Sequence, residues 1–166
     1  MFEEMRQSLV SVMSKIFETM FFLDIEPQEM GKVPGSPVAL LPNPPGVGDQ
    51  SGGFIRSSIR FEGPRSGMIS LILPAVLAQL MAKNFLGLEE EEASESQTCD
   101  MARELANIIS GNLLPVLDRK GSYSLSLPKT EPSAYPGLNH PGSRSGCAVD
   151  LDVEGHWVQL SIFFDE

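Results

Sequence analysis

Residues 104–112 read Glu104-Leu105-Ala106-Asn107-Ile108-Ile109-Ser110-Gly111-Asn112, and they predict the middle of an amphipathic helix. At roughly 100° per residue, one arc of this helix carries Asp100, Glu104, Asn107 and Gly111. The opposite arc is apolar and consists of Met101, Leu105, Ile108, Ile109 and Val116. Such a helix buries one side and presents a carboxylate and a carboxamide on the other. That arrangement suits docking onto a partner, and the amide suits orienting a water molecule.

The predicted helix runs from about Thr98 to Leu117. Pro115 is expected to kink or tighten its last turn, because proline lacks an N–H. Asparagine is a poor helix former, and glycine costs about 1 kcal/mol in a helix interior. Asn107 and Gly111 interrupt the helix without a local benefit, as residues at functional sites often do. The alternative interpretation is that Glu104 and Asn107 are ordinary solvent-facing residues, and their spacing alone leaves it open.

Length, charge and cysteine content limit the possible functions. The chain has 166 residues and a formal net charge of −10, which suits one domain over residues 1–166 and argues against a nucleic-acid partner or an anionic membrane surface. Cys99 and Cys147 form no CxxC pair and indicate two half-buried thiols in a reducing compartment. The acidic N-terminus lacks the basic region of a signal peptide, and no apolar run is long enough to span a membrane. We therefore expect a cytoplasmic protein.

Apolar periodicity predicts the remaining elements. Two more helices are expected over 4–20 and 74–87, the second burying Val76, Leu77, Leu80 and Met81. Besides a short extended segment at 21–26, strands are expected over 54–61, 67–73, 122–127, 147–153 and 157–164. Pro- and Gly-rich loops occupy 33–53 and 128–146, and an acidic linker occupies 88–96. The order α-β-β-α-α-β-β-β predicts an α+β fold, with helices covering a largely antiparallel sheet.

Several kinds of site find no support in the sequence. No G-x-S-x-G elbow accompanies the two histidines, His140 and His156, which are expected in loops. Asp150 and Asp152 share one face of a strand, and we interpret that face as the solvated side of the sheet. No His, Cys or Asp spacing matches a metal site, so no metal ligands are predicted.

Residues 104–112 resemble the signature of the CheX/CheC/FliY family of chemotaxis phosphatases. The resemblance extends to the segment Phe17–Phe22, to the strand–turn–strand that leads to Leu73-Pro74, and to the last strand. CheX is the most similar member in architecture, because the chain has one Glu-x-x-Asn pair whereas CheC-type proteins carry two. Near the end of the first helix, where a second copy is conceivable, Glu18 is followed three residues later by Phe21.

The resemblance implies a CheC-like fold and a hydrolase of two-component signalling in chemotaxis. Its substrate would be the aspartyl phosphate of a CheY-like response regulator. Asn107 would orient the attacking water, and Glu104 would pair with a lysine of the regulator, while Asp100, Arg103 and Gly111 would contact the partner. No cofactor is expected on this chain, since the Mg²⁺ would belong to the regulator. Members of the CheX type form homodimers by pairing across sheets, and the apolar C-terminal strands suit that arrangement.

Two other functions remain open at the level of sequence. The first is a non-catalytic module that binds a response regulator or a motor-switch component, which would bind without accelerating phosphate loss. The second is a small-ligand sensory domain in which the 33–53 segment forms a lid.

Overall fold

A computed structural model describes residues 2–27, 53–133 and 145–165. The helical elements of these residues are α1 (Phe2–Ile16), the π-helical turn η1 (Phe17–Phe21), α2 (Ala75–Phe85) and α3 (Glu95–Leu117). The strands are β1 (Ile25–Pro27), β2 (Phe54–Glu62), β3 (Gly67–Pro74), β4 (Ser124–Leu125), β5 (Lys129–Ser133), β6 (Ser145–Val153) and β7 (His156–Phe164). The predicted loops at 33–53 and 128–146 lie largely outside these residues, as does His140, so most of the first loop remains a prediction.

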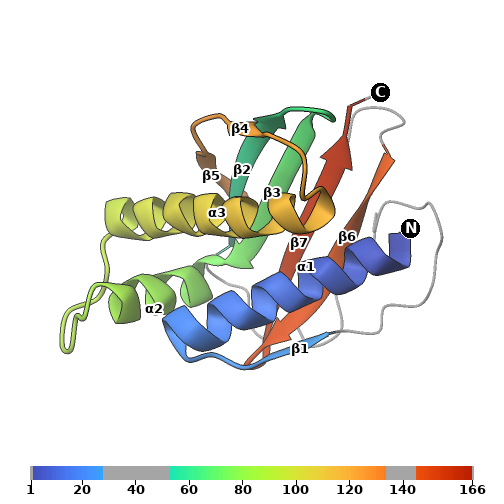
Figure 1. Ribbon diagram of the computed structural model, residues 1–166. Coiled ribbons are helices and arrows are strands. Elements are labelled where there is room, and N and C mark those ends of the chain that lie inside the picture. The colour runs from blue at the N-terminus through green and yellow to red at the C-terminus, as the bar shows by residue number, and fades with distance from the viewer. Residues whose placement is uncertain (1, 28–52, 134–144, 166) are drawn as a thin grey trace.

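The strands form one antiparallel sheet in the order β1-β6-β7-β3-β2-β4, and β5 also pairs with β2. The three α-helices lie together on one face of it (Figure 1). Each half of the chain contains a helix, a short edge strand and a β-hairpin. The edge strand of each half pairs with the hairpin of the other half. The edge strand β1 of the first half pairs with β6, whereas β4 and β5 of the second half pair with β2. The α+β fold class predicted from the sequence is confirmed.

The hydrophobic core lies between the helices and the sheet. The alternating residues Ile55, Ile59 and Phe61 of β2 face this layer and are buried. They belong to one core with the apolar sides of the helices, among which Leu9, Met13 and Phe17 are fully buried. Burial of such side chains is the main favourable contribution to folding, and it fixes which side of each helix faces out.

The helix α3 begins earlier than the sequence predicts. Ser94 caps it: the hydroxyl accepts from the backbone N–H of Gln97 at 3.1 Å, and the Gln97 side chain accepts from the N–H of Ser94 at 2.9 Å. This capping box satisfies two donors at the helix start, so the helix includes residues that we assign to the acidic linker 88–96. The helix continues two residues beyond Pro115.

The predicted buried face of α2 is partly wrong. Leu77 and Met81 are buried as expected, but Val76 is 52% exposed and Leu80 is 44% exposed. Small residues take their places, because Ala78 and Ala82 face the core. Alanine contributes little to an apolar pattern. The predicted buried side of α2 is therefore rotated by about one residue from the observed one.

The structure adds one strand that the sequence does not predict and shortens another. Within the loop predicted at 128–146, Lys129–Ser133 forms β5 along the outer edge of β2. The strand predicted at 122–127 reduces to β4, Ser124–Leu125. The residues of β5 have no local strand pattern, and they become a strand through backbone hydrogen bonds to the edge of β2. His156 begins β7 instead of lying in the turn, which consists of Glu154 and Gly155, both with positive φ.

The assignment of Asp150 to the solvated side of the sheet is wrong. Its side chain is 5% exposed and accepts hydrogen bonds from Trp157 Nε1 at 2.8 Å and Gln159 Nε2 at 3.1 Å. This group lies on the helix-free face, where Trp157 also packs edge-on against Phe54. Asp152 is partly buried and accepts from the Gly155 N–H at 2.6 Å. The alternation predicted the face correctly, but not that the middle of this face is buried.

Burial raises the pKa of Asp150, against the opposing effects of the hydrogen bonds from Gln159 and Trp157 and of the charge of Arg6. Between the pKa of the unfolded carboxyl, about 4, and the higher folded pKa, the folded state holds a proton that the unfolded chain has lost. The free energy of unfolding therefore falls as pH rises through this window. We expect Asp150→Asn, which keeps an acceptor oxygen, to remove that part of the pH dependence in denaturant titrations.

Asp24→Asn is the matched control, because Asp24 is an exposed carboxylate. Emission of Trp157, the single tryptophan, follows unfolding in both variants. If Asp150→Asn keeps the pH dependence of the parent protein, the carboxyl does not titrate as its burial requires.

Candidate functional site

The outward side of α3 carries the residues predicted to form the site. Asp100, Glu104 and Gly111 are exposed, and Asn107 is partly buried. The opposite side of the helix is buried through nine residues: Thr98, Met101, Ala102, Leu105, Ala106, Ile109, Ser110, Leu113 and Leu114. The structure therefore brings the predicted site residues onto one surface, which we call the α3 row: Asp100, Arg103, Glu104, Asn107 and Gly111.

A rigid element holds the α3 row. The helix has 23 residues and packs against α1, α2 and β2. Leu105 and Ala106, which directly precede Asn107, are 1% and 2% exposed. Since these neighbours are locked in the core, the backbone that carries the carboxamide cannot rotate without unpacking them.

The two residues central to the prediction keep their polar groups available. In the described part of the chain, the side chains of Glu104 and Asn107 make no hydrogen bond or ion pair. A carboxamide has two N–H donors and an acceptor oxygen. Asn107 can therefore donate to and accept from an external molecule, one turn away from the carboxylate of Glu104.

Two further residues of the α3 row pair with each other. Arg103 Nη1 donates to Asp100 Oδ1 at 2.6 Å, and both side chains remain largely exposed. Exposed pairs of this kind add little to stability, so both groups can exchange their bond for contacts to a partner. Both residues were predicted to contact the partner, but their ion pair was not predicted. Opposite charges three residues apart on a helix could have indicated this pair.

Gly111 leaves the α3 row open at its C-terminal end. Beyond its own helix, a Cβ placed on it would meet no atom of the described residues within 4 Å, so packing in the described part of the chain does not require glycine there. Pro115 has no N–H to bond the carbonyl of Gly111, which reinforces the opening. The glycine therefore weakens the helix while exposing backbone to an approaching surface.

The prediction for the last turn of α3 is wrong at Val116, which is 54% exposed. Leu113 and Leu114 are buried instead. Ile108, also assigned to the apolar arc, is only partly buried, although it packs against the core. The apolar arc turns toward Leu114 near Pro115, so helical spacing from the middle of α3 does not extend to its end.

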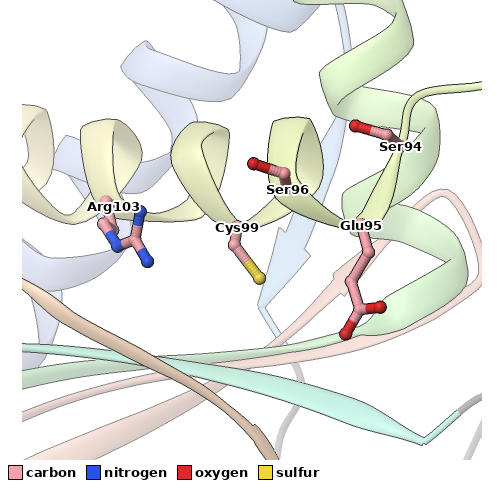
Figure 2. A pocket seen from close by; sticks show the side chains of 5 residues that line it. All are labelled: Ser94, Glu95, Ser96, Cys99 and Arg103. Carbon is pink, nitrogen blue, oxygen red and sulfur yellow. The ribbon is translucent and has the colours of Figure 1, made fainter.

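An open hollow of about 540 Å³ lies at the N-terminal end of α3, lined by Ser94, Glu95, Ser96, Cys99 and Arg103. Figure 2 shows Glu95, Cys99 and Arg103 projecting to the same side of the helix. Cys99 is a free, half-buried thiol, like Cys147, and burial raises the pKa of Cys147 to about 11. The hollow shares only Arg103 with the α3 row.

Residues 2–27, 53–133 and 145–165 contain neither a cluster of metal ligands nor a membrane-spanning helix. No three His, Cys, Asp or Glu side chains in these ranges come together as metal ligands. None of the helices there combines the length and the apolar character that crossing a membrane requires.

Comparison with known proteins identifies the family. Residues 55–151, which include α3, match the family described as chemotaxis phosphatase CheX. The chain belongs to the CheX family. No curated protein sequence matches it.

Solved structures share the fold at low sequence identity. A chemotaxis protein CheX from Desulfovibrio desulfuricans is 17% identical, with 98% of this chain and 99% of that chain covered and a TM-score of 0.75. A CheC-like superfamily protein from Shewanella sp. PV-4 is 16% identical, with both chains covered completely and a TM-score of 0.70. A CheX–CheY–BeF₃–Mg²⁺ complex from Borrelia burgdorferi contains a chain that is 15% identical, with 96% and 97% covered and a TM-score of 0.61. The CheC-like fold predicted from the resemblance is thereby confirmed.

Proposed function

We propose that this protein hydrolyses the aspartyl phosphate of a CheY-like response regulator. The observation that carries the proposal is the carboxamide of Asn107, which stands on the outward side of α3 without a partner in the described chain. Membership of the CheX phosphatase family supports it. So does the fold shared with a CheX that has been solved together with CheY, BeF₃ and Mg²⁺.

The chemistry demands little more than position. An acyl phosphate is already reactive, and phosphoryl transfer depends on alignment and charge stabilisation. A neutral amide can hold a water in line with the phosphorus by donating and accepting hydrogen bonds. The glutamine that orients water in GTPases performs the same task. No covalent intermediate on this chain is needed, and the Mg²⁺ would be held by the regulator.

The other members of the α3 row would fix the docked regulator. Glu104, whose carboxylate has no ion pair within the described residues, would meet a lysine of the regulator, at the spacing that places Asn107 beside it. Arg103 and Asp100 would exchange their exposed ion pair for contacts to the partner. Gly111 would let the partner approach the helix backbone closely.

Substitution of Asn107 tests the catalytic assignment. We expect Asn107→Ala to reduce the stimulated loss of phosphate roughly 100-fold, because the water is no longer positioned. The measurement is dephosphorylation of a phosphorylated CheY-like regulator with Mg²⁺. Gln7→Ala is the matched control, since Gln7 is an exposed carboxamide on α1 that follows the exposed Glu4 at the same spacing. Full activity of Asn107→Ala would remove the assignment.

Substitution of Glu104 separates docking from chemistry. Loss of a charge-assisted contact to lysine acts mainly on affinity. We expect Glu104→Ala to raise KM and the Kd for the regulator about tenfold, with a smaller change in kcat. Glu91→Ala, in the exposed acidic linker, provides the control. An unchanged Kd with a large loss of kcat would contradict the docking role.

The alternative proposal is a module that binds a regulator or motor-switch component without catalysis. It would retain the effects of Glu104→Ala on the Kd, but neither the parent protein nor Asn107→Ala would accelerate phosphate loss. A cytoplasmic location follows from the proposed partner and agrees with the two free thiols.

A homodimer is also part of the proposal, through pairing across sheets. The strand β7 is hydrogen-bonded to β3 on one side and β6 on the other, so such pairing would use an edge strand and not the C-terminal strand itself. We expect light scattering to give twice the monomer mass of 18.1 kDa. A single species of monomer mass at micromolar concentration would contradict the dimer.

A further inference from the structure

We propose that Val76 and Leu80 of α2 form an apolar extension of the regulator-docking surface, beside the α3 row. This inference rests on the proposed function, because it assigns the occupant of the surface as the response regulator. It adds two contact residues on a second helix, neither of which belongs to the α3 row.

Val76 and Leu80 are apolar side chains that remain exposed on a helix packed against the core. They are four residues apart and therefore share one face of α2. Val76 is 52% and Leu80 is 44% exposed, whereas Leu77 and Met81, one residue further on, are at most 1% exposed. The helix thus has two apolar faces, and only one of them is used by the core.

The second apolar face points outward from the helix layer. On the turn between Val76 and Leu80, Gln79 donates to Glu92 Oε2 at 3.3 Å and to the carbonyl of Ala93 at 3.2 Å. Those acceptors belong to the connection into α3, so Gln79 marks the flank of α2 that faces α3. Val76 and Leu80 lie 60° and 100° round from Gln79, on the side away from the buried arc.

The outward faces of α2 and α3 form one surface. The two helices pack against each other and lie side by side on the same face of the sheet (Figure 1). Packed helices are separated by 8–10 Å, whereas a typical interface covers about 800 Å² on each partner. A protein domain that docks on the α3 row therefore also covers the adjacent face of α2.

The composition of this combined surface suits a protein partner. The α3 row is polar throughout and offers little apolar area, although apolar burial drives most protein association. Protein interfaces place apolar residues beside a polar rim. Val76 and Leu80 supply the apolar part next to the row. The other exposed apolar residues lie elsewhere: Phe85 and Leu86 at the C-terminal end of α2, Phe22 at the end of η1, Val116 at the end of α3, and Leu125 and Leu127 at the sheet edge.

The test is the double variant Val76→Ser/Leu80→Ser. The probe is a CheY-like regulator activated with beryllium fluoride and Mg²⁺, which gives the Kd, and the phosphorylated regulator, which gives KM and kcat. We expect the Kd and KM to rise roughly tenfold and kcat to stay unchanged, because no reacting atom is touched. Leu127→Ser is the matched control, since Leu127 is 90% exposed. Melting curves and Trp157 emission verify the fold.

An unchanged Kd in the folded double variant overturns the inference. It is also overturned if the variant loses self-association while binding the regulator normally, because the surface would then belong to a second copy of the chain. Failure of the proposed function looks different: the parent protein binds the regulator without accelerating phosphate loss. In that case the Kd of the double variant still decides whether α2 takes part in docking.

Discussion

Burial of the apolar side of α3 determines what this protein can present to a partner. Met101, Leu105 and Ile109 are at most 4% exposed, and each such side chain contributes roughly 1.5–3 kcal/mol when fully buried. A rotation of the helix by one residue would bring Asn107 toward the core and expose these side chains. The direction of the carboxamide is therefore set by hydrophobic packing on the other side of the same helix, with no hydrogen bond needed to hold it.

Because packing on the buried side stabilises α3, its outward side can contain residues that weaken a helix. The 23-residue length, the capping box at Ser94 and the packing against α1, α2 and β2 stabilise α3. These contributions offset the cost of Asn107, which gains no side-chain hydrogen bond from the described residues, and of Gly111, which gains no close packing from them. Packing in the core sets the position of Asn107, whereas its carboxamide remains available for hydrogen bonds to a partner.

Burial and secondary structure were predicted correctly where they depend on neighbours close in sequence, and incorrectly where they depend on residues from distant strands. The rotation of α3 followed from helical spacing, as did the outward placement of Asp100, Glu104, Asn107 and Gly111, whereas Arg103 was named only through the family resemblance. The burial of Asp150 did not, because its partners Trp157 and Gln159 come from the next strand of the hairpin. The strand β5 was missed for the same reason, since Lys129–Ser133 has no strand pattern and depends on the edge of β2. At Val76 and Leu80 the pattern was misleading, because alanines fill the core positions of α2.

The exchange of edge strands between the two halves has a consequence for assembly. Neither half can complete its sheet from its own residues, because β1 needs β6 and β2 needs β4 and β5. The last strand in sequence, β7, occupies the middle of the sheet between β3 and β6. Contacts of such long sequence separation slow folding. During synthesis, the hairpin of β2 and β3 can form early, but it carries an unpaired edge until β7 leaves the ribosome, so this nascent chain is exposed to premature strand pairing with its neighbours.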